Sequence, residues 1–137
     1  MDYSVNYLAV LVSAVLAFGI GSLWYGPLFG KAWQKGVGLS DEEIKGANMG
    51  KLFGSAFIMA LIVSFGMAMF FFGFGPNPDM NAGMGAMYGI MTGIFFIFPS
   101  TAMNYLFARK SATLIAIDSC YHIVAYTLVG VILGAWQ

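Results

Sequence analysis

The stretch that decides the fold is Leu52-Phe-Gly-Ser-Ala-Phe-Ile-Met-Ala-Leu-Ile-Val-Ser-Phe-Gly-Met-Ala-Met-Phe-Phe-Phe-Gly-Phe74, which contains no charged residue. A run of roughly 20 apolar residues is long enough to cross a bilayer as a helix. Three further runs of this kind occur, and the only charged residue within them is Asp118. We therefore predict an all-α, polytopic membrane protein, a compact bundle of four transmembrane helices at about 5–25, 52–74, 82–107 and 112–136.

The composition of the chain also indicates a protein that lies in a lipid bilayer. Of its 137 residues, 60% are hydrophobic and only 9% are charged, whereas a soluble domain carries about a quarter charged residues. Six basic and six acidic residues give no net charge, which excludes the basic surface that nucleic-acid binding requires. The single cysteine excludes a disulfide framework and any multi-cysteine metal site. The predicted partner is the lipid bilayer, and no nucleic acid is expected.

The four predicted helices leave little of the chain for anything else. One loop, residues 26–51, is substantial, while the connections 75–81 and 108–111 are short. The first run has no basic segment before it, so we interpret it as a permanent helix and not as a secretory signal peptide. The whole chain is expected to form one transmembrane domain, residues 1–137.

The basic residues predict the orientation, because Lys and Arg near helix ends are retained on the cytoplasmic side. All six lie in the loop 26–51 or in the connection 108–111, and four helices place these two segments on one side. Both termini, with Asp2, and the turn around Asp79 then face the outside. The predicted topology is N-out and C-out.

The long loop is expected to contain one short helix at the cytoplasmic interface. Ser40 followed by Glu43 has the spacing of a capping box at a helix start. Trp24, Tyr25 and Trp33 are predicted to anchor at the level of the lipid headgroups. The loop is either a docking surface or a solvated connection that sets the orientation.

Small residues at four-residue spacing occur on several of the predicted helices, and in a bilayer such ladders let helices approach closely. Gly85, Gly89 and Gly93 form one on the third helix, while Ser13 and Ser64 belong to ladders on the first and second. No glycine-rich stretch is followed by the Lys-Ser or Lys-Thr of a P-loop. The number of ladders favours a homo-oligomer, but a single bundle that uses every ladder internally also fits.

The candidate functional residues are the ionisable groups at membrane depth, which are rare and usually face a bundle interior or a pathway. Asp118 and His122 are four residues apart and therefore share one helix face, which Tyr126 continues. Counting from Lys110, Asp118 lies roughly 12 Å and His122 roughly 18 Å into the membrane.

Polar residues of the neighbouring helices are predicted at similar depth. Pro99 cannot donate the hydrogen bond that the Phe95 carbonyl expects, so the third helix should kink there with a freed acceptor nearby. Counting the same distance back from Arg109, across the tight turn between the third and fourth helices, places Ser100 and Thr101 level with Asp118. The complete predicted seam contains Asp118, His122, Ser100, Thr101, Asn104 and Tyr126, with Ser13 and Ser64 near the level of His122.

This polar seam has two interpretations, which the sequence leaves open. It could hold helices together, because interhelical hydrogen bonds contribute on the order of 0.6–2 kcal/mol. It could also be a proton or ion path, or a site for a polar headgroup, with Asp118 as the titrating group and His122 as its relay or donor. No Ser/His/Asp triad, His-Glu-x-x-His motif or pair of carboxylates identifies a catalytic residue.

Methionines are unusually frequent, and several collect in the outer half of the predicted bundle. Met80, Met84, Met87 and Met91 share one predicted helix face. Thioethers are ligands for Cu(I), but methionine also fills irregular packing. Because this half lacks Cys and His, we expect packing and predict no cofactor.

Two stretches, Asn6-Tyr-Leu-Ala-Val-Leu-Val-Ser13 and Gly21-Ser-Leu-Trp-Tyr-Gly-Pro-Leu-Phe-Gly-Lys-Ala-Trp33, resemble the bacterial membrane-protein family called domain of unknown function 1761. Ile117-Asp-Ser-Cys-Tyr-His122 and Gly134-Ala-Trp136 resemble its last helix. The resemblance covers essentially the whole chain and implies a four-helix protein of the bacterial inner membrane, without a known activity. The positions typical of the family are Asn6, Trp24, Tyr25, Gly26, Pro27, Trp33 and Asp118.

We expect a small membrane helix bundle that passes or binds an ion, proton or small solute through the seam around Asp118. The alternative is a structural or accessory subunit that docks to a larger membrane complex through its small-residue faces. A membrane-bound enzyme ranks third, because the sequence has no recognisable nucleophile or cofactor motif.

Overall fold

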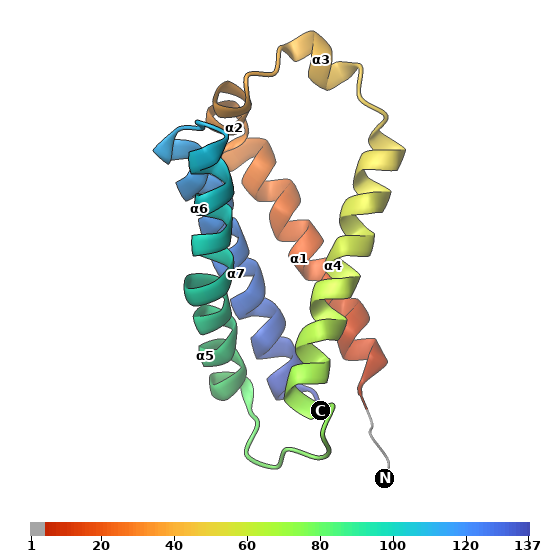
Figure 1. The fold of residues 1–137 in the computed structure, drawn as a ribbon. Helices are drawn as coiled ribbons and strands as arrows, with labels where there is room; N and C mark the ends of the chain where they lie inside the picture. The colour runs from red at the N-terminus through yellow and green to blue at the C-terminus, as the bar shows by residue number, and fades with distance from the viewer. Residues whose placement is uncertain (1–4) are drawn as a thin grey trace.

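The computed structural model describes residues 5–137, and this part of the chain is helical and contains no β-strand. Asp2, predicted to lie outside the membrane, is not among the described residues. Four helical segments are long and apolar enough to cross a membrane, namely Tyr7–Leu28, Met49–Phe72, Ala82–Phe107 and Ala112–Ala135. The predicted number of spans is therefore confirmed for the described residues (Figure 1).

One of the four segments ends in a short π-helix, and another is interrupted by one. The elements are α1 (Tyr7–Leu23), the π-helix η1 (Trp24–Leu28), α2 (Gly30–Val37), α3 (Asp41–Lys45), α4 (Met49–Phe72), α5 (Ala82–Thr92), the π-helix η2 (Gly93–Ile97), α6 (Phe98–Phe107) and α7 (Ala112–Ala135). Each π-helix lies at a proline, since Pro27 is inside η1 and Pro99 follows η2. Proline lacks the N–H that the regular helix needs, so the backbone changes its hydrogen-bond spacing locally.

Each spanning segment begins at a side-chain cap. The side chains of Asn6, Asn48, Asn81 and Ser111 accept hydrogen bonds from backbone N–H groups three residues later. Such caps satisfy N–H groups that a helix start leaves free. Asn48 explains why the second segment begins at Met49, three residues before the predicted start.

The long loop contains two helices where one was predicted. The capping box of Ser40 and Glu43 is confirmed and opens α3. The additional helix, α2, follows η1 almost directly and ends at Gly38, whose φ of 76° is left-handed. Glycine adopts that conformation at little steric cost, which is why it commonly ends a helix.

The two ends of the molecule differ in composition. We call the end with α2, α3 and the turn 108–111 the loop end, and the end with Val5, Gln137 and the connection 73–81 the terminal end (Figure 1). Five of the six Lys and Arg residues belong to these segments of the loop end, and Lys51 lies in the first turn of α4, which begins there. This arrangement agrees with the predicted segregation of basic residues.

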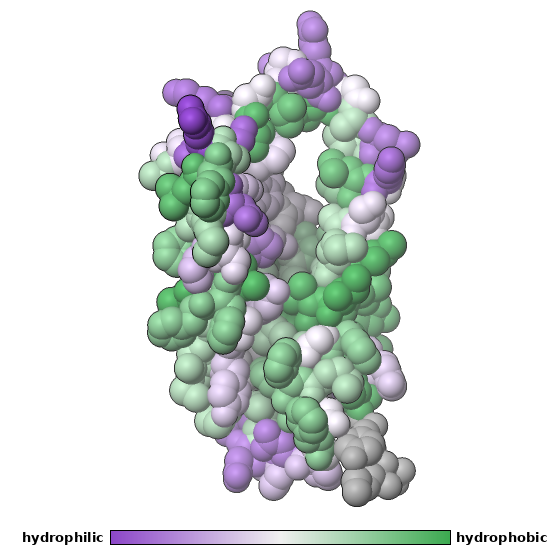
Figure 2. Space-filling model, in the orientation of Figure 1, coloured by the Kyte–Doolittle hydropathy of each residue, from purple (hydrophilic) through white to green (hydrophobic). Residues whose placement is uncertain are grey.

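Helix α7 is the centre of the packing. It contacts α5 most extensively and also touches α1, α6, η2 and α2. Helix α4 packs mainly on α1, and at the loop end the two meet through the ring of Phe18, which lies edge-on to Phe53 and Phe57. Figure 2 shows that side chains leave an opening below α3 at this end.

Close packing of α5 on α7 depends on the predicted glycine ladder. A Cβ added at Gly85 would overlap the backbone carbonyl of Gly130, and one at Gly89 would lie 2.7 Å from Cα of Thr127. A Cβ at Gly93 would lie 2.8 Å from Cα of Ile123. Only glycine permits these contacts, in line with small-residue packing in membranes.

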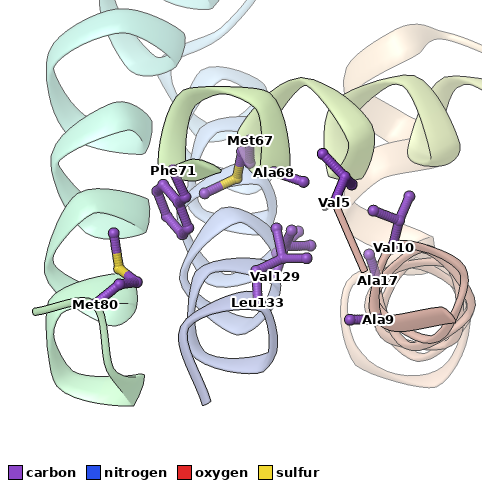
Figure 3. Packing of buried hydrophobic residues seen from close by; sticks show 11 residues of the cluster. Val5, Ala9, Val10, Ala17, Met67, Ala68, Phe71, Met80, Val129 and Leu133 are labelled. Atoms are coloured by element: carbon purple, nitrogen blue, oxygen red, sulfur yellow. The ribbon is translucent and has the colours of Figure 1, made fainter. Parts of the chain in front are cut away.

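The apolar core lies in the half of the molecule near the terminal end. Figure 3 shows side chains of α1, α4 and α7 converging there, with Met80 from the connection before α5. The cluster comprises Val5, Ala9, Val10, Ala17, Met67, Ala68, Phe71, Met80, Ala125, Val129 and Leu133. The hydrogen bonds between two side chains of the described residues lie in the other half, near the loop end.

Candidate functional site

The carboxylate of Asp118 is held between two other segments of the chain. Its side chain is buried in α7, with 6% of its surface exposed. The Tyr25 hydroxyl donates a hydrogen bond to Oδ1 at 2.6 Å, and the Tyr105 hydroxyl donates one to Oδ2 at 2.5 Å. Both carboxylate oxygens thus accept a hydrogen bond from a hydroxyl group. We call Asp118, Tyr25 and Tyr105 the Asp118 cluster.

Tyr25 reaches Asp118 because η1 is anchored on α7 beside it. The indole Nε1 of the preceding residue, Trp24, donates a hydrogen bond to the carbonyl oxygen of Ile117 at 3.0 Å. The wider π-helical turn around Pro27 carries both aromatic residues on the side of α7. Such π-helical turns are frequent at functional sites.

Tyr105 reaches the same carboxylate from α6, which is joined to α7 by the short turn 108–111. Arg109 in this turn has a φ of 58°. Near Pro99, where a kink was predicted, the α-helix changes to the π-helix η2 directly before α6.

Aromatic rings surround the cluster on the side of α1 and α2. Trp33 of α2 packs edge-on against Tyr25, with 5.7 Å between ring centroids. Tyr121 lies 5.3 Å from Tyr25 and donates a hydrogen bond to the carbonyl oxygen of Ala17 at 3.2 Å. Trp24, Tyr25 and Trp33, predicted as headgroup anchors, are therefore half-buried in contacts within the molecule.

His122 and Tyr126 follow Asp118 on α7, as the spacing predicted. Their ring centroids are 6.4 Å apart, and His122 also lies beside Tyr121 at 5.1 Å. Among residues 5–137, neither His122 nor Tyr126 has a side-chain hydrogen-bond partner. The structure thus brings them next to the cluster but does not link them to it.

The polar residues predicted on the third span lie elsewhere. The Ser100 hydroxyl is exposed and donates a hydrogen bond to the Phe96 carbonyl of its own helix at 2.6 Å. Thr101 is half-buried and Asn104 is exposed. No hydrogen bond joins any of the three to Asp118 within the described residues.

Three serine hydroxyls are buried without a hydrogen-bond partner among residues 5–137: Ser13, Ser64 and Ser119. The first two were predicted near the level of His122, and both side chains are completely buried. Ser119 lies next to Asp118 in the sequence and was not predicted as a site residue.

Tyr105 is the residue of the Asp118 cluster that was absent from the predicted site. Side chains of an α-helix lean toward its N-terminus. The side chain of Tyr105 therefore extends from the loop end toward the membrane centre, while that of Asp118 leans toward the loop end. The predicted depths were derived from Cα positions only. A correction for the direction of the side chains would have placed Tyr105 next to Asp118.

The methionines do not converge on one point. Met80 is buried and Met84 is half-buried, whereas Met87 and Met91 of the same predicted face are exposed. In Figure 3, Met67 and Met80 lie on either side of Phe71 within the apolar cluster. Their contacts are those of packing residues.

The chemistry available at the Asp118 cluster is that of one carboxylate and two phenols. Short hydrogen bonds from O–H donors to a carboxylate are charge-assisted and stabilise its negative charge. Within residues 5–137, no group of three or more His, Cys, Asp and Glu could hold a metal ion. The cluster thus holds a single carboxylate between two hydroxyl donors.

Comparison with known proteins adds a family and no activity. The model of the family described as "Protein of unknown function (DUF1761)" matches residues 8–134, nearly the whole chain. Neither the curated proteins nor the solved structures contain a match.

Proposed function

We infer the function of this chain, which belongs to the DUF1761 family, from the Asp118 cluster. We propose that the protein reversibly binds a proton at Asp118 and in this way takes part in the binding or passage of an ion, a proton or a small solute. The observation that carries this proposal is that both oxygens of a buried carboxylate accept hydrogen bonds from hydroxyl groups of two other spans.

A buried carboxylate at membrane depth is costly, which favours a functional role. Tyr25 and Tyr105 hold the carboxylate in one orientation, and their hydroxyl groups are able both to donate and to accept hydrogen bonds. His122, one helical turn further along α7, is the proposed relay or donor. This arrangement favours a proton over a metal ion, because a single carboxylate with neutral phenols resembles no common set of metal ligands.

Access from the loop end is the proposed route. The other half of the molecule contains the apolar cluster and the tight α5–α7 contact. The proposal therefore places binding at the loop end. Passage through the molecule would require α4 to move relative to the other spans, and α4 packs mainly on α1. The basic loops favour the cytoplasm for this end, in a bacterial inner membrane.

Infrared difference spectroscopy of the reconstituted protein tests proton binding. As the pH is lowered, we expect the wild type to show one carboxylic acid band that Asp118→Asn lacks and Asp79→Asn retains, in addition to the bands of the other acids. Asp79 is an exposed acid at the terminal end, so the second variant is the matched control. Identical carboxylic acid bands in the wild type and Asp118→Asn would show that the titrating group is elsewhere.

A flux measurement tests the consequence of proton binding. Proteoliposomes containing a pH-sensitive dye should respond to a pH step with the wild-type protein and with Asp79→Asn, and much less with Asp118→Asn. If Asp118→Asn impairs assembly but leaves the response of the assembled protein intact, the cluster only holds the helices together and the proposal is wrong.

A second candidate function, a subunit that docks to another membrane protein or to further copies of itself, is favoured by glycines that the monomer does not use. A Cβ added at Gly19 of α1 or Gly54 of α4 would meet no atom within 4 Å. Such positions suit close helix contacts. Mass measurement of the particle purified in a native detergent distinguishes a homo-oligomer, a complex with a larger partner and a monomer.

A further inference from the structure

Four basic side chains of the loop end lie at one corner of the molecule, and all four are exposed. Lys31 and Lys35 are one helical turn apart on α2, while Arg109 and Lys110 belong to the turn before α7. Helix α2 packs on α7, and Figure 1 shows it next to the turn that joins α6 and α7. We call Lys31, Lys35, Arg109 and Lys110 the basic corner.

The contact between α2 and α7 brings the two pairs close together. A Cβ added at Gly36 would lie 3.1 Å from Cδ1 of Leu114, so the backbone of α2 lies directly against the first turn of α7. Gly36 follows Lys35 in the chain, and Leu114 comes four residues after Lys110. The positive end of the α7 dipole lies at the same place. Positive charge is therefore concentrated at this corner.

The acids of the loop end do not neutralise this charge. All three, Asp41, Glu42 and Glu43, belong to α3, which lies beyond the ends of the spans in Figure 1. Asp41 accepts a hydrogen bond from Gln34 at 2.7 Å, and Glu43 accepts one from the backbone of Ser40. Within residues 5–137, no carboxylate forms an ion pair with the basic corner. Its cations are thus available to an external anion.

Arg109 occupies a backbone position that favours glycine. Its φ of 58° is left-handed. The N–H of Lys110 donates a hydrogen bond to the Tyr105 carbonyl at 2.9 Å, and the N–H of Arg109 donates one to the Leu106 carbonyl at 3.1 Å. This is the pattern of a Schellman motif, in which glycine is the usual left-handed residue. Arginine is strained there, which indicates that its side chain has a role of its own.

The basic corner lies next to apolar surface of the spanning segments. Leu28 ends the first segment three residues before Lys31, and Phe107 ends the third two residues before Arg109. Both apolar side chains are exposed, Leu28 to 63% and Phe107 to 85%. Cations beside exposed apolar side chains at the end of a span match a molecule with an anionic head and hydrocarbon chains.

We propose that the basic corner binds the phosphate of an anionic phospholipid, whose chains lie along the exposed apolar surface of the adjacent spans. Lys and Arg at a membrane surface attract anionic lipids, and an arginine can donate to two phosphate oxygens at once. The neighbouring apolar side chains favour a phospholipid over a soluble anion. The site is separate from the Asp118 cluster, because its cations are exposed and lie outside the spanning segments.

Native mass spectrometry of the protein in detergent tests the proposal, because it counts bound phospholipids by their mass. The wild type should bind one phosphatidylglycerol more tightly than phosphatidylcholine with the same chains. Glycerol phosphate, which has a phosphate but no chains, should compete only at much higher concentration. No membrane is present, so the result reports lipid binding and not the retention of basic residues on the cytoplasmic side.

Two double variants that lose the same charge locate the site. Lys35→Gln with Arg109→Gln removes one cation from each side of the corner. This variant should bind phosphatidylglycerol about 25-fold more weakly, at about five-fold for each charge. Lys45→Gln with Lys51→Gln is the matched control, because these two residues belong to α3 and α4 and lie outside the basic corner. The control should bind the lipid like the wild type.

The remaining outcomes decide the proposal. Equal losses in the two double variants would overturn the corner as a site, because net charge alone would then attract the lipid. Equal binding of the two phospholipids, or equal competition by glycerol phosphate and phosphatidylglycerol, would overturn recognition of an anionic phospholipid. If the first double variant does not fold, Lys31→Gln with Lys110→Gln takes its place under the same criterion. Asp118→Asn should bind the lipid normally, so failure of the proton-binding proposal and failure of this one remain distinguishable.

Discussion

Asp118 joins three spans through one side chain. Its carboxylate in the fourth span accepts hydrogen bonds from Tyr25 at the end of the first and Tyr105 at the end of the third. Removing one donor leaves a buried charged oxygen without a partner, which typically costs about 1–3 kcal/mol. The two tyrosines therefore contribute to stability whether or not Asp118 exchanges protons.

Tyr25→Phe and Tyr105→Phe should each lower the free energy of unfolding by about 1–3 kcal/mol, because each leaves one carboxylate oxygen unsatisfied. Unfolding of the purified protein in detergent, followed by circular dichroism, measures the change. Tyr7→Phe is the control, since Tyr7 is 70% exposed and its stacking on Phe65 needs no hydroxyl.

The two substitutions should also be non-additive, because they share the carboxylate of Asp118. In an Asp118→Asn background, their effects should shrink, since the charge that both hydroxyls stabilise is gone. Equal losses for Tyr7→Phe and Tyr25→Phe would contradict the role of the hydrogen bonds.

At the scale of elements, the close contact between α5 and α7 sets the helix packing within which the Asp118 cluster and the apolar core lie. Backbones approach each other at Gly85, Gly89 and Gly93, where a Cβ would meet backbone atoms of α7. The π-helix η1 ends the first span and contains Tyr25, and η2 lies in the third span directly before α6, which contains Tyr105. The glycines determine how closely the helices pack, and the two π-helical turns position the side chains near Asp118.

Gly89→Ala should destabilise the protein by about 1–3 kcal/mol, because the new methyl group meets backbone atoms that cannot move independently. Gly19→Ala should be neutral or should stabilise the protein by about 0.5–1 kcal/mol, since that position is open and alanine favours the helix. Thermal unfolding of the two variants in the same detergent compares them. Similar behaviour would mean that the α5–α7 contact is looser than the structure indicates.

At the scale of the whole molecule, charge and polarity are distributed unevenly. The basic residues lie at the loop end, the Asp118 cluster lies beneath them, and the apolar core fills the half near the termini. Figure 2 shows the same separation, with hydrophilic surface at both ends and apolar surface between them. The molecule is thus polarised along the direction in which it would cross a membrane.

A reporter enzyme that is active only outside the cytoplasm should be active when fused after Gln137 and inactive when inserted after Lys45. The reason is that the loop end contains all six basic residues, which are retained on the cytoplasmic side. The insertion after Lys45 serves as the matched control. An inactive fusion at Gln137 would exclude the predicted N-out, C-out topology.

The polar site could be predicted only in part. The depth of Asp118 and its shared face with His122 and Tyr126 follow from helical spacing, and the structure places the three accordingly. The partners of Asp118 were not predicted, because Ser100 and Thr101 had been selected by Cα level alone. Tyr105 lies nearer the turn but reaches Asp118 through the direction of its side chain.

The sequence by itself determined that four helices are able to cross a membrane and that one of them contains a buried acid. Hydropathy and capping depend on neighbouring residues in the chain, so they can be recognised without tertiary structure. Only the tertiary structure decided that Tyr25 and Tyr105 meet on Asp118, that α4 packs mainly on α1, and that a groove opens beside Tyr126. These features depend on π-helical turns, side-chain directions and glycine contacts between segments far apart in the chain, and local patterns do not encode such distances.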